Sequence, residues 1–203
     1  MPARSILTDH PAPVSLSHVV LRTAHLDETI AFYEMLIGMK VNFRNDVGAA
    51  LSHDGEHHRI ALAAVPPAEQ NPYAPGLEHL AFKLRSIGDL LGNYERVKQL
   101  GVVPSVTIHH GGTISAYYVD PDGVQVETFV DTQIADLSLE EMAGEGFRSN
   151  PVGVPIDFDD LTRRFTAGET LVSLLAQPPL QEGQLEELMG KMLAARVVAR
   201  STS

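Results

Sequence analysis

Two histidines and one glutamate have the residue types and the placement of a metal site. His18 and His79 occupy equivalent positions in two similar strand-like segments, LSHVVLR (16–22) and LEHLAFK (77–83), and Glu127 lies in the apolar segment VQVETFV. A buried carboxylate is costly unless a cation, a proton or several donors accompany it. A strand histidine is more often a hydrogen-bonded core or surface residue than a ligand, and a strand glutamate usually faces water. The repeated placement of the histidines favours a two-His-one-carboxylate site.

The number of ligands indicates the kind of chemistry. Aligning the turn Asp54-Gly55 with Asp122-Gly123 places the counterpart of Glu127 near residues 59–62, and no carboxylate lies there. The site would therefore have three protein ligands. Such a site leaves positions for a bidentate substrate and O2, as in non-heme Fe(II) oxygenases. A site with four protein ligands would suit Lewis-acid chemistry on one substrate.

Other polar side chains are candidates for proton transfer near this site. His57 and His58 precede the strand-like run RIALAAV, His109 and His110 end the run SVTIHH, and Tyr117 lies in ISAYYV. Histidine exchanges protons near neutral pH, so either pair could serve as an acid or base. Adjacent residues of a strand face opposite ways, so one member of each pair is expected to face the site. The alternative is that these are exposed loop histidines.

A sequence duplication provides the elements that must position these residues. Each copy begins with a strand-like segment and continues into a helical pattern, at 26–38 and at 86–101, with Asp27 and Ser86 as candidate caps and Gly38 and Gly101 at the helix ends. Three short strand-like runs follow in each copy, with His-Asp-Gly and Pro-Asp-Gly turns. The sequence therefore predicts an α+β fold with paired βαβββ modules, at about 15–66 and 76–131.

The chain divides into three regions. Residues 1–14 are rich in proline and are expected to form a flexible N-terminal arm, and residues 15–131 hold both modules. Residues 132–203 are expected to form a C-terminal extension of loop and helices, with a final amphipathic helix at 182–198. That helix could belong to the core or to an interface, and we expect a homo-oligomer.

Composition excludes several classes of function. The 203 residues contain no cysteine, so disulfides, thiolate metal sites and cysteine nucleophiles are absent, and a metal site would use nitrogen and oxygen ligands. A net charge of -11 argues against nucleic acid or an anionic membrane as a partner. The apolar runs are shorter than the roughly 20 residues that span a bilayer, and no secretory signal is evident. We therefore expect a cytoplasmic protein.

Four segments resemble a known superfamily. LSHVVLRT, AFYEMLIGMKV, LEHLAFKL and YYVDPDGVQVETF are similar to the vicinal oxygen chelate superfamily, whose paired βαβββ modules form a curled-sheet cup around a metal. Within it, HHGGTISAYYVDPDGVQVETF most resembles the small single-domain type I extradiol ring-cleavage dioxygenases. The resemblance implies His18, His79 and Glu127 as ligands of Fe(II), or less often Mn(II).

The resemblance also implies a reaction and further site residues. The reaction is the opening of a catechol-type aromatic diol by O2, next to the diol. His58 is the acid/base candidate, His109 or His110 would stabilise developing charge, and Tyr117 would hydrogen-bond a substrate oxygen. Alternatives on the same fold are a glyoxalase-like lyase, an epimerase or a thiol transferase. A metal-free binding module is an alternative from another class.

Overall fold

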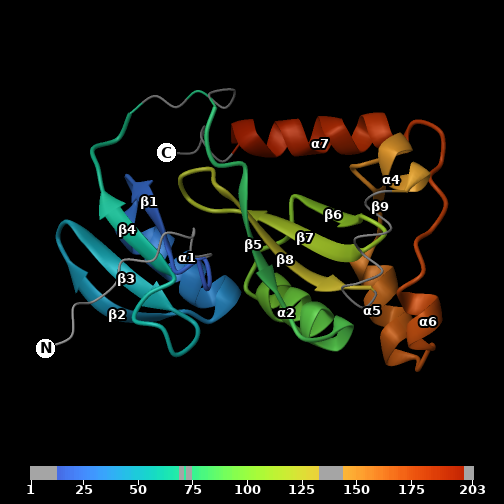
Figure 1. Ribbon diagram of the computed structural model, residues 1–203, viewed down its shortest axis with the longest axis horizontal. Coiled ribbons are helices and arrows are strands. Elements are labelled where there is room, and N and C mark those ends of the chain that lie inside the picture. Colours follow the sequence, from blue (N-terminus) through green and yellow to red (C-terminus); the bar gives the residue numbers. More distant parts are fainter. Residues whose placement is uncertain (1–12, 69–70, 72–74, 133–143, 199–203) are drawn as a thin grey trace, which may run out of the picture.

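The computed structural model describes residues 13–68, 71, 75–132 and 144–198, and Figure 1 shows two sheets side by side. Most of the expected N-terminal arm, residues 1–12, lies outside the described residues. The first sheet has the strand order β1-β4-β3-β2, with β1 parallel to β4 and the other pairs antiparallel. The elements of this module are β1 (Val19–Thr23), α1 (Leu26–Ile37), β2 (Lys40–Asn45), β3 (Gly48–Ser52) and β4 (Ile60–Ala64).

The second module repeats this arrangement. Its sheet has the order β5-β8-β7-β6-β9, and β5 is parallel to β8 as β1 is to β4. Its elements are β5 (His79–Lys83), α2 (Ile87–Gln99), β6 (Val106–His109), β7 (Thr113–Val119) and β8 (Gln125–Asp131), and β9 (Val154–Pro155) comes from the extension. The predicted α+β class and the paired βαβββ modules are confirmed. The two sheets remain separate and do not close into one barrel.

Each helix packs on one face of its sheet. In β1, Leu21 and Thr23 are buried while Val20 and Arg22 are exposed, which is the alternation expected of a strand with one covered face. Burying a large apolar side chain contributes about 1.5–3 kcal/mol, so the helix-covered face of each sheet supplies much of the stability of the fold. The buried cluster spans both modules and includes Tyr33, Leu36, Leu51, Ile60, Leu90, Leu91, Val97, Ile114 and Val126.

Local signals set most helix ends as predicted. Gly38 ends α1 in the left-handed conformation with φ of 72°, which glycine adopts without strain. Ser86 caps α2, and its hydroxyl accepts the backbone N–H of Asp89. The expectation for Asp27 is wrong, because His25 is the N-cap residue of α1 and makes no side-chain cap hydrogen bond. Asp27 instead lies in the first turn, where its charge favours the helix dipole.

Buried hydrogen bonds join the two modules. The carboxylate of Asp122, in the β7–β8 turn, accepts the backbone N–H of Ala24 at 2.9 Å and the hydroxyl of Thr29 at 3.2 Å. The hydroxyl of Tyr33 donates to Asp120 at 3.3 Å. The sequence predicted only a turn at Pro-Asp-Gly. The structure shows that the same turn holds helix α1 of the first module against the second.

The C-terminal extension covers the second sheet. β9 pairs with β6, and α5 (Phe158–Thr166) packs near α2, where the hydroxyl of Tyr94 donates to Asp159 at 2.8 Å. α7 (Gln184–Val198) lies across the sheet face opposite α2 (Figure 1), and Leu188 is buried in a cluster with Val106, Ile108 and Tyr117. The remaining helices are α4 (Glu145–Ser149) and α6 (Leu171–Leu174). None of the described helices is long and apolar enough to cross a membrane.

Candidate active site

Two of the expected ligands meet on the second sheet. β5 and β8 are parallel neighbours with Ala81 opposite Glu127, so His79 and Glu127 point to the same face. The Nε2 atom of His79 lies 3.2 Å from Oε2 of Glu127. Glu127 is 7% exposed, whereas the side chain of His79 is about one third exposed. A buried carboxylate and a reachable imidazole therefore form one half of the expected site.

The electrostatics of this pair favour the charged carboxylate. Burial raises the pKa of Glu127, but His79, Ser115 and His110 together outweigh burial and leave the pKa lowered, with His79 acting through both its hydrogen bond and its charge. The same hydrogen bond raises the pKa of His79, against the opposing effect of burial. Glu127 is thus a buried anion beside an imidazole, and both residue types ligate metal ions in proteins.

Tyr117 and His110 extend this group along the same face. Tyr117 lies opposite Glu127 in the β7–β8 register, and its ring meets the ring of His79 edge-on at 5.6 Å between centroids. Its hydroxyl lies 3.0 Å from Nε2 of His110, the residue that follows β6. Burial raises the pKa of Tyr117 and lowers the pKa of His110, so the phenol keeps its proton and the imidazole is neutral. The pair can therefore share one proton.

His109 points away from this group. Its Nε2 atom lies 3.0 Å from the carbonyl oxygen of Leu175 in the extension, and its Nδ1 accepts the backbone N–H of Gly111 at 3.1 Å. These contacts require the proton on Nε2, so both ring nitrogens are in use. Of the two adjacent histidines, the structure places His110 with Tyr117 and His109 against the extension.

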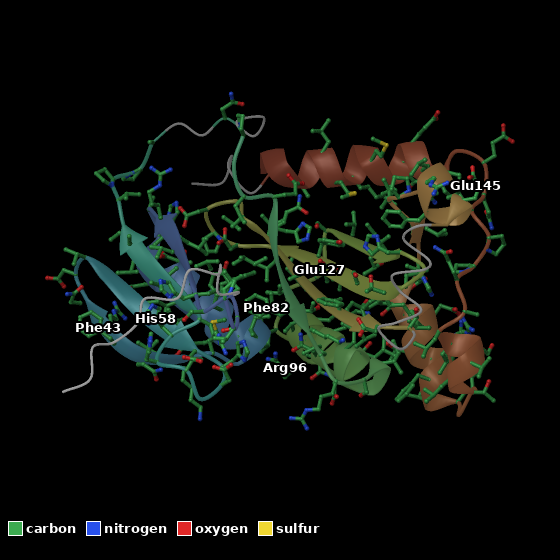
Figure 2. All side chains as sticks on the ribbon, in the orientation of Figure 1. Phe43, His58, Phe82, Arg96, Glu127 and Glu145 are labelled. Carbon is green, nitrogen blue, oxygen red and sulfur yellow. The ribbon has the colours of Figure 1, made fainter. Side chains whose placement is uncertain are left out.

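His18 and His58 lie in the first module, His18 directly before β1 and His58 in the loop before β4. His18 is exposed, and its ring centroid is 4.3 Å from that of His58. The Nδ1 atom of His58 lies 2.5 Å from Nδ1 of His57. Figure 2 shows His58 in the first module, well separated from Glu127 in the second. In the part of the chain that the structure describes, no three His, Cys, Asp or Glu side chains are arranged to hold a metal ion. One chain thus brings together two of the three expected ligands.

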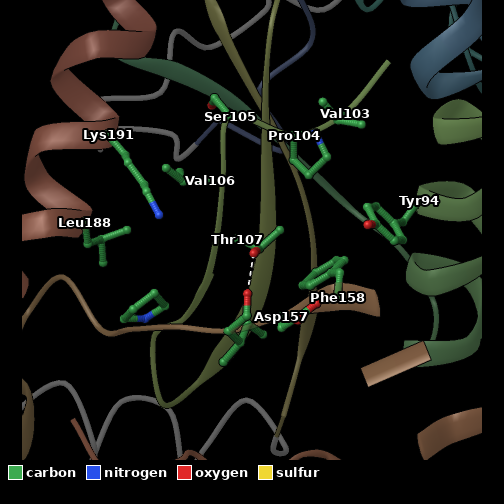
Figure 3. A pocket seen from close by; sticks show the side chains of 12 residues that line it. Tyr94, Val103, Pro104, Ser105, Val106, Thr107, Asp157, Phe158, Leu188 and Lys191 are labelled. Atoms are coloured by element: carbon green, nitrogen blue, oxygen red, sulfur yellow. Dashed lines mark hydrogen bonds between the residues drawn. The ribbon is translucent and has the colours of Figure 1, made fainter. Parts of the chain in front are cut away.

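The two expected histidine ligands border the same cleft. A cleft of about 770 Å³ is lined by His18 from the start of the first module and by His79 from β5, with Arg59 and Phe82 among its walls. A smaller cavity of about 330 Å³ lies where the extension meets β6. Figure 3 shows Leu188 and Lys191 of α7 on one side of this cavity. It also shows Thr107 of β6, whose hydroxyl donates to the carbonyl of residue 156. That cavity contains none of the expected ligands.

Comparison with known proteins defines the class. Residues 15–128 match the family model described as the Glyoxalase/Bleomycin resistance protein/Dioxygenase superfamily, and the chain belongs to this family. A domain of this family from Frankia sp. EAN1pec shares the fold, with a TM-score of 0.51 and 24% identity over 59% of this chain and 93% of that chain.

Curated relatives are similar over a larger part of the chain. Biphenyl-2,3-diol 1,2-dioxygenase 2 of Rhodococcus globerulus is 36% identical over 160 residues, which cover 77% of this chain and 84% of the relative. Biphenyl-2,3-diol 1,2-dioxygenase 3 of the same organism is 34% identical over 157 residues, or 75% of this chain and 83% of the relative. Lactoylglutathione lyase of Neisseria meningitidis is 28% identical over 135 residues, or 61% of this chain and 95% of the lyase.

Proposed function

We propose that this protein is an extradiol dioxygenase, which opens the ring of a catechol-type aromatic diol next to its two hydroxyl groups and incorporates both atoms of O2. The observation that carries the proposal is the group on one face of the second sheet: a buried carboxylate 3.2 Å from an imidazole, with a phenol and a second imidazole beside them. The similarity to two biphenyl-2,3-diol dioxygenases directs this chemistry toward aromatic diols.

The donor types suit a mononuclear Fe(II) ion, or Mn(II). His79 and Glu127 offer one nitrogen and one carboxylate oxygen, and such mixed donors suit these ions. Glu127 supports this fit, because a carboxylate that is 7% exposed needs a positive partner. The bound ion would supply adjacent positions for the diol and O2. His18, which directly precedes β1 in the other module, is the third expected donor.

The protein's own residues would orient the substrate and handle its protons. Tyr117 keeps its hydroxyl proton and can donate it in a hydrogen bond to a substrate oxygen. His110, 3.0 Å from that hydroxyl, can hold the proton at Nε2 while the phenol oxygen accepts from the substrate. His58, beside His18, is the acid/base candidate of the first sheet. α7 covers the face that carries Tyr117 and limits the access of water.

The direct test is oxygen consumption by the Fe(II)-loaded protein. The protein is loaded with Fe(II) without oxygen and then given catechol, 3-methylcatechol and 2,3-dihydroxybiphenyl in air. We expect one O2 consumed per diol, with the visible absorbance of a ring-fission product. A metal-loaded protein that consumes no oxygen with any catechol of a broad panel contradicts the proposal. Oxygen-independent formation of a glutathione thioester from glutathione and a 2-oxoaldehyde would favour the lyase alternative.

Adjacent residues on opposite faces provide matched controls. Tyr117→Phe should lower kcat strongly, whereas Tyr118→Phe, on the opposite face that α2 covers, should leave it near the wild-type value. His79→Ala should abolish tight metal binding while the circular dichroism spectrum and unfolding midpoint remain close to wild type. Equal effects of the two tyrosine substitutions would show that Tyr117 has no special role in the reaction.

A further inference from the structure

His110, the imidazole that exchanges a proton with Tyr117 in the proposed reaction, is weakly held by its own stretch of chain. It directly follows β6 and precedes two consecutive glycines, and glycine has more backbone freedom than any other residue. We propose that the C-terminal extension positions His110 for the reaction, and that His109 and Gln177 are the positioning residues through which it acts. This inference rests on the proposed function.

The ring of His109 ties the extension to the turn that follows β6. His109 is 2% exposed, and both of its ring nitrogens are bonded. Nε2 donates to the carbonyl of Leu175 at 3.0 Å, and Nδ1 accepts the backbone N–H of Gly111 at 3.1 Å. The two residues on either side of His110 are therefore fixed to one buried ring. Breaking either contact would leave a buried polar group without a partner, which is costly.

The peptide group between His109 and His110 is held on both sides. Its carbonyl oxygen accepts the side-chain amide of Gln177, in the extension, at 2.9 Å. Its N–H, which belongs to His110, donates to the carbonyl of Thr113 at 2.8 Å across the turn. Because a peptide group is planar, two hydrogen bonds on opposite sides fix its rotation, and with it the direction in which the His110 side chain leaves the backbone.

The backbone of the extension also lies directly against His110. β9 pairs with β6, with Val154 opposite His109. A Cβ on the neighbouring Gly153 would lie 2.9 Å from the Cα of His110, so the two backbones are in close contact. Asn150 holds Gly153 there through hydrogen bonds of 2.8 Å to its carbonyl and 2.9 Å from its N–H. The extension thus contacts His110 as well as the residue before it.

These contacts direct the ring of His110 at the site. Its Nε2 atom lies 3.0 Å from the hydroxyl of Tyr117, and the two rings meet edge-on. Burial lowers the pKa of His110, while the charge of Glu127 and a hydrogen bond to the backbone of Val152 act in the opposite direction. Proton exchange depends on the distance and angle of the hydrogen bond, so a small displacement of His110 should slow the reaction without weakening metal binding. The family model ends at residue 128, so this hold comes from outside the shared domain.

Two substitutions each release one contact with the extension. Gln177→Met keeps the length of the side chain and removes its donor to the carbonyl of His109. His109→Asn keeps an acceptor for the N–H of Gly111 but does not reach Leu175. The matched control is Gln181→Ala, at an exposed residue of the same extension. One folded variant of the two is enough for the test.

The first measurement uses the metal-free protein. Its histidine rings are labelled with nitrogen-15 and observed by NMR, and the His110 signals are identified by their loss in His110→Gln. In Gln177→Met and His109→Asn these signals should move toward their positions in Tyr117→Phe, because the hydrogen bond to the phenol is weakened. They should keep their wild-type positions in Gln181→Ala.

The second measurement is the kinetics of the Fe(II)-loaded protein with 3-methylcatechol. Each variant should lower kcat about tenfold, while KM and the affinity for Mn(II) change by less than about twofold. Movement of the His110 signals together with the fall in kcat supports the inference, and either one without the other overturns it. Wild type that consumes no O2 with any catechol overturns the proposed function, and the spectra of the metal-free protein still decide whether the extension holds His110.

Discussion

Asp120 is a buried carboxyl at the junction between the modules, and its ionisation should make stability depend on pH. It is 2% exposed. Burial raises its pKa, and the neighbouring Asp122 carboxylate adds to this, while the backbone N–H groups of Val124 and Asp122 and the hydroxyl of Tyr33 lower it. The result is a pKa of about 6. Asp120 should therefore be protonated in the folded chain at a pH where it is ionised in the unfolded chain.

The size of the effect follows from this difference. The pKa rises from 3.8 to about 6, and each pKa unit corresponds to about 1.4 kcal/mol, which gives about 3 kcal/mol. The folded state holds the proton more tightly than the unfolded state, so this group favours folding most at low pH. Its contribution to the free energy of unfolding should fall as the pH rises from about 4 to about 6, and the loss should be complete above that range.

The comparison of wild type with Asp120→Asn isolates this effect. Asparagine keeps an oxygen to accept the N–H groups of Asp122 and Val124 but cannot ionise. Urea unfolding of the metal-free protein at one protein concentration, from pH 4 to 8, should show the variant gaining about 3 kcal/mol relative to wild type. Asp46→Asn, at the exposed β2–β3 turn, controls for the loss of one surface charge.

The pH profile itself provides the decisive result. Tyr33→Phe removes a hydrogen-bond donor to the Asp120 carboxylate, which should raise the pKa of Asp120 further. The unfolding free energy of this variant should begin to differ from that of wild type as Asp120 ionises. The pH midpoint of its stability loss should lie higher than in wild type. A constant difference in unfolding free energy between Asp120→Asn and wild type across this range would refute the reasoning. It would show that Asp120 ionises at the same pH in the folded and unfolded chains.

Three further predictions, for Leu188, Gly153 and Gly190, test the C-terminal extension. Leu188→Ala should lower the free energy of unfolding by about 2–4 kcal/mol in a urea titration, because Leu188 is only 2% exposed. The control Met189→Ala should change it little, because Met189 is 56% exposed. Gly153→Ala should destabilise the protein and lower its unfolding midpoint, because Gly153 has φ of 99° and a Cβ would lie 2.5 Å from the carbonyl oxygen of His109; an unchanged midpoint would contradict this packing. Gly190→Ala, exposed within α7 with nothing near its Cβ, should raise stability by about 0.5–1 kcal/mol, and a loss of stability would argue that this helix face is covered.

Local sequence patterns were enough to predict the elements and their repetition. The helix ends at Gly38 and Ser86 follow from backbone freedom and side-chain capping, which are properties of a few consecutive residues. The alternation in β5 and β8 placed His79 and Glu127 on faces that could meet, because strand side chains alternate with a fixed period. Local periodicity is enough for such statements, and it identified both members of the 3.2 Å pair.

Which side chains contact one another depends on strand register and on the packing of the modules. The sequence left His109 and His110 equivalent, and the strand register together with the contact of His109 with Leu175 separated them. A register shift of one residue would reverse the faces of a whole strand, and neighbouring residues alone do not specify it. The separation of His18 from Glu127 likewise depends on how the two modules pack. That packing is held by Asp122, whose partners Ala24 and Thr29 lie 98 and 93 residues away along the chain and are therefore invisible to any local pattern.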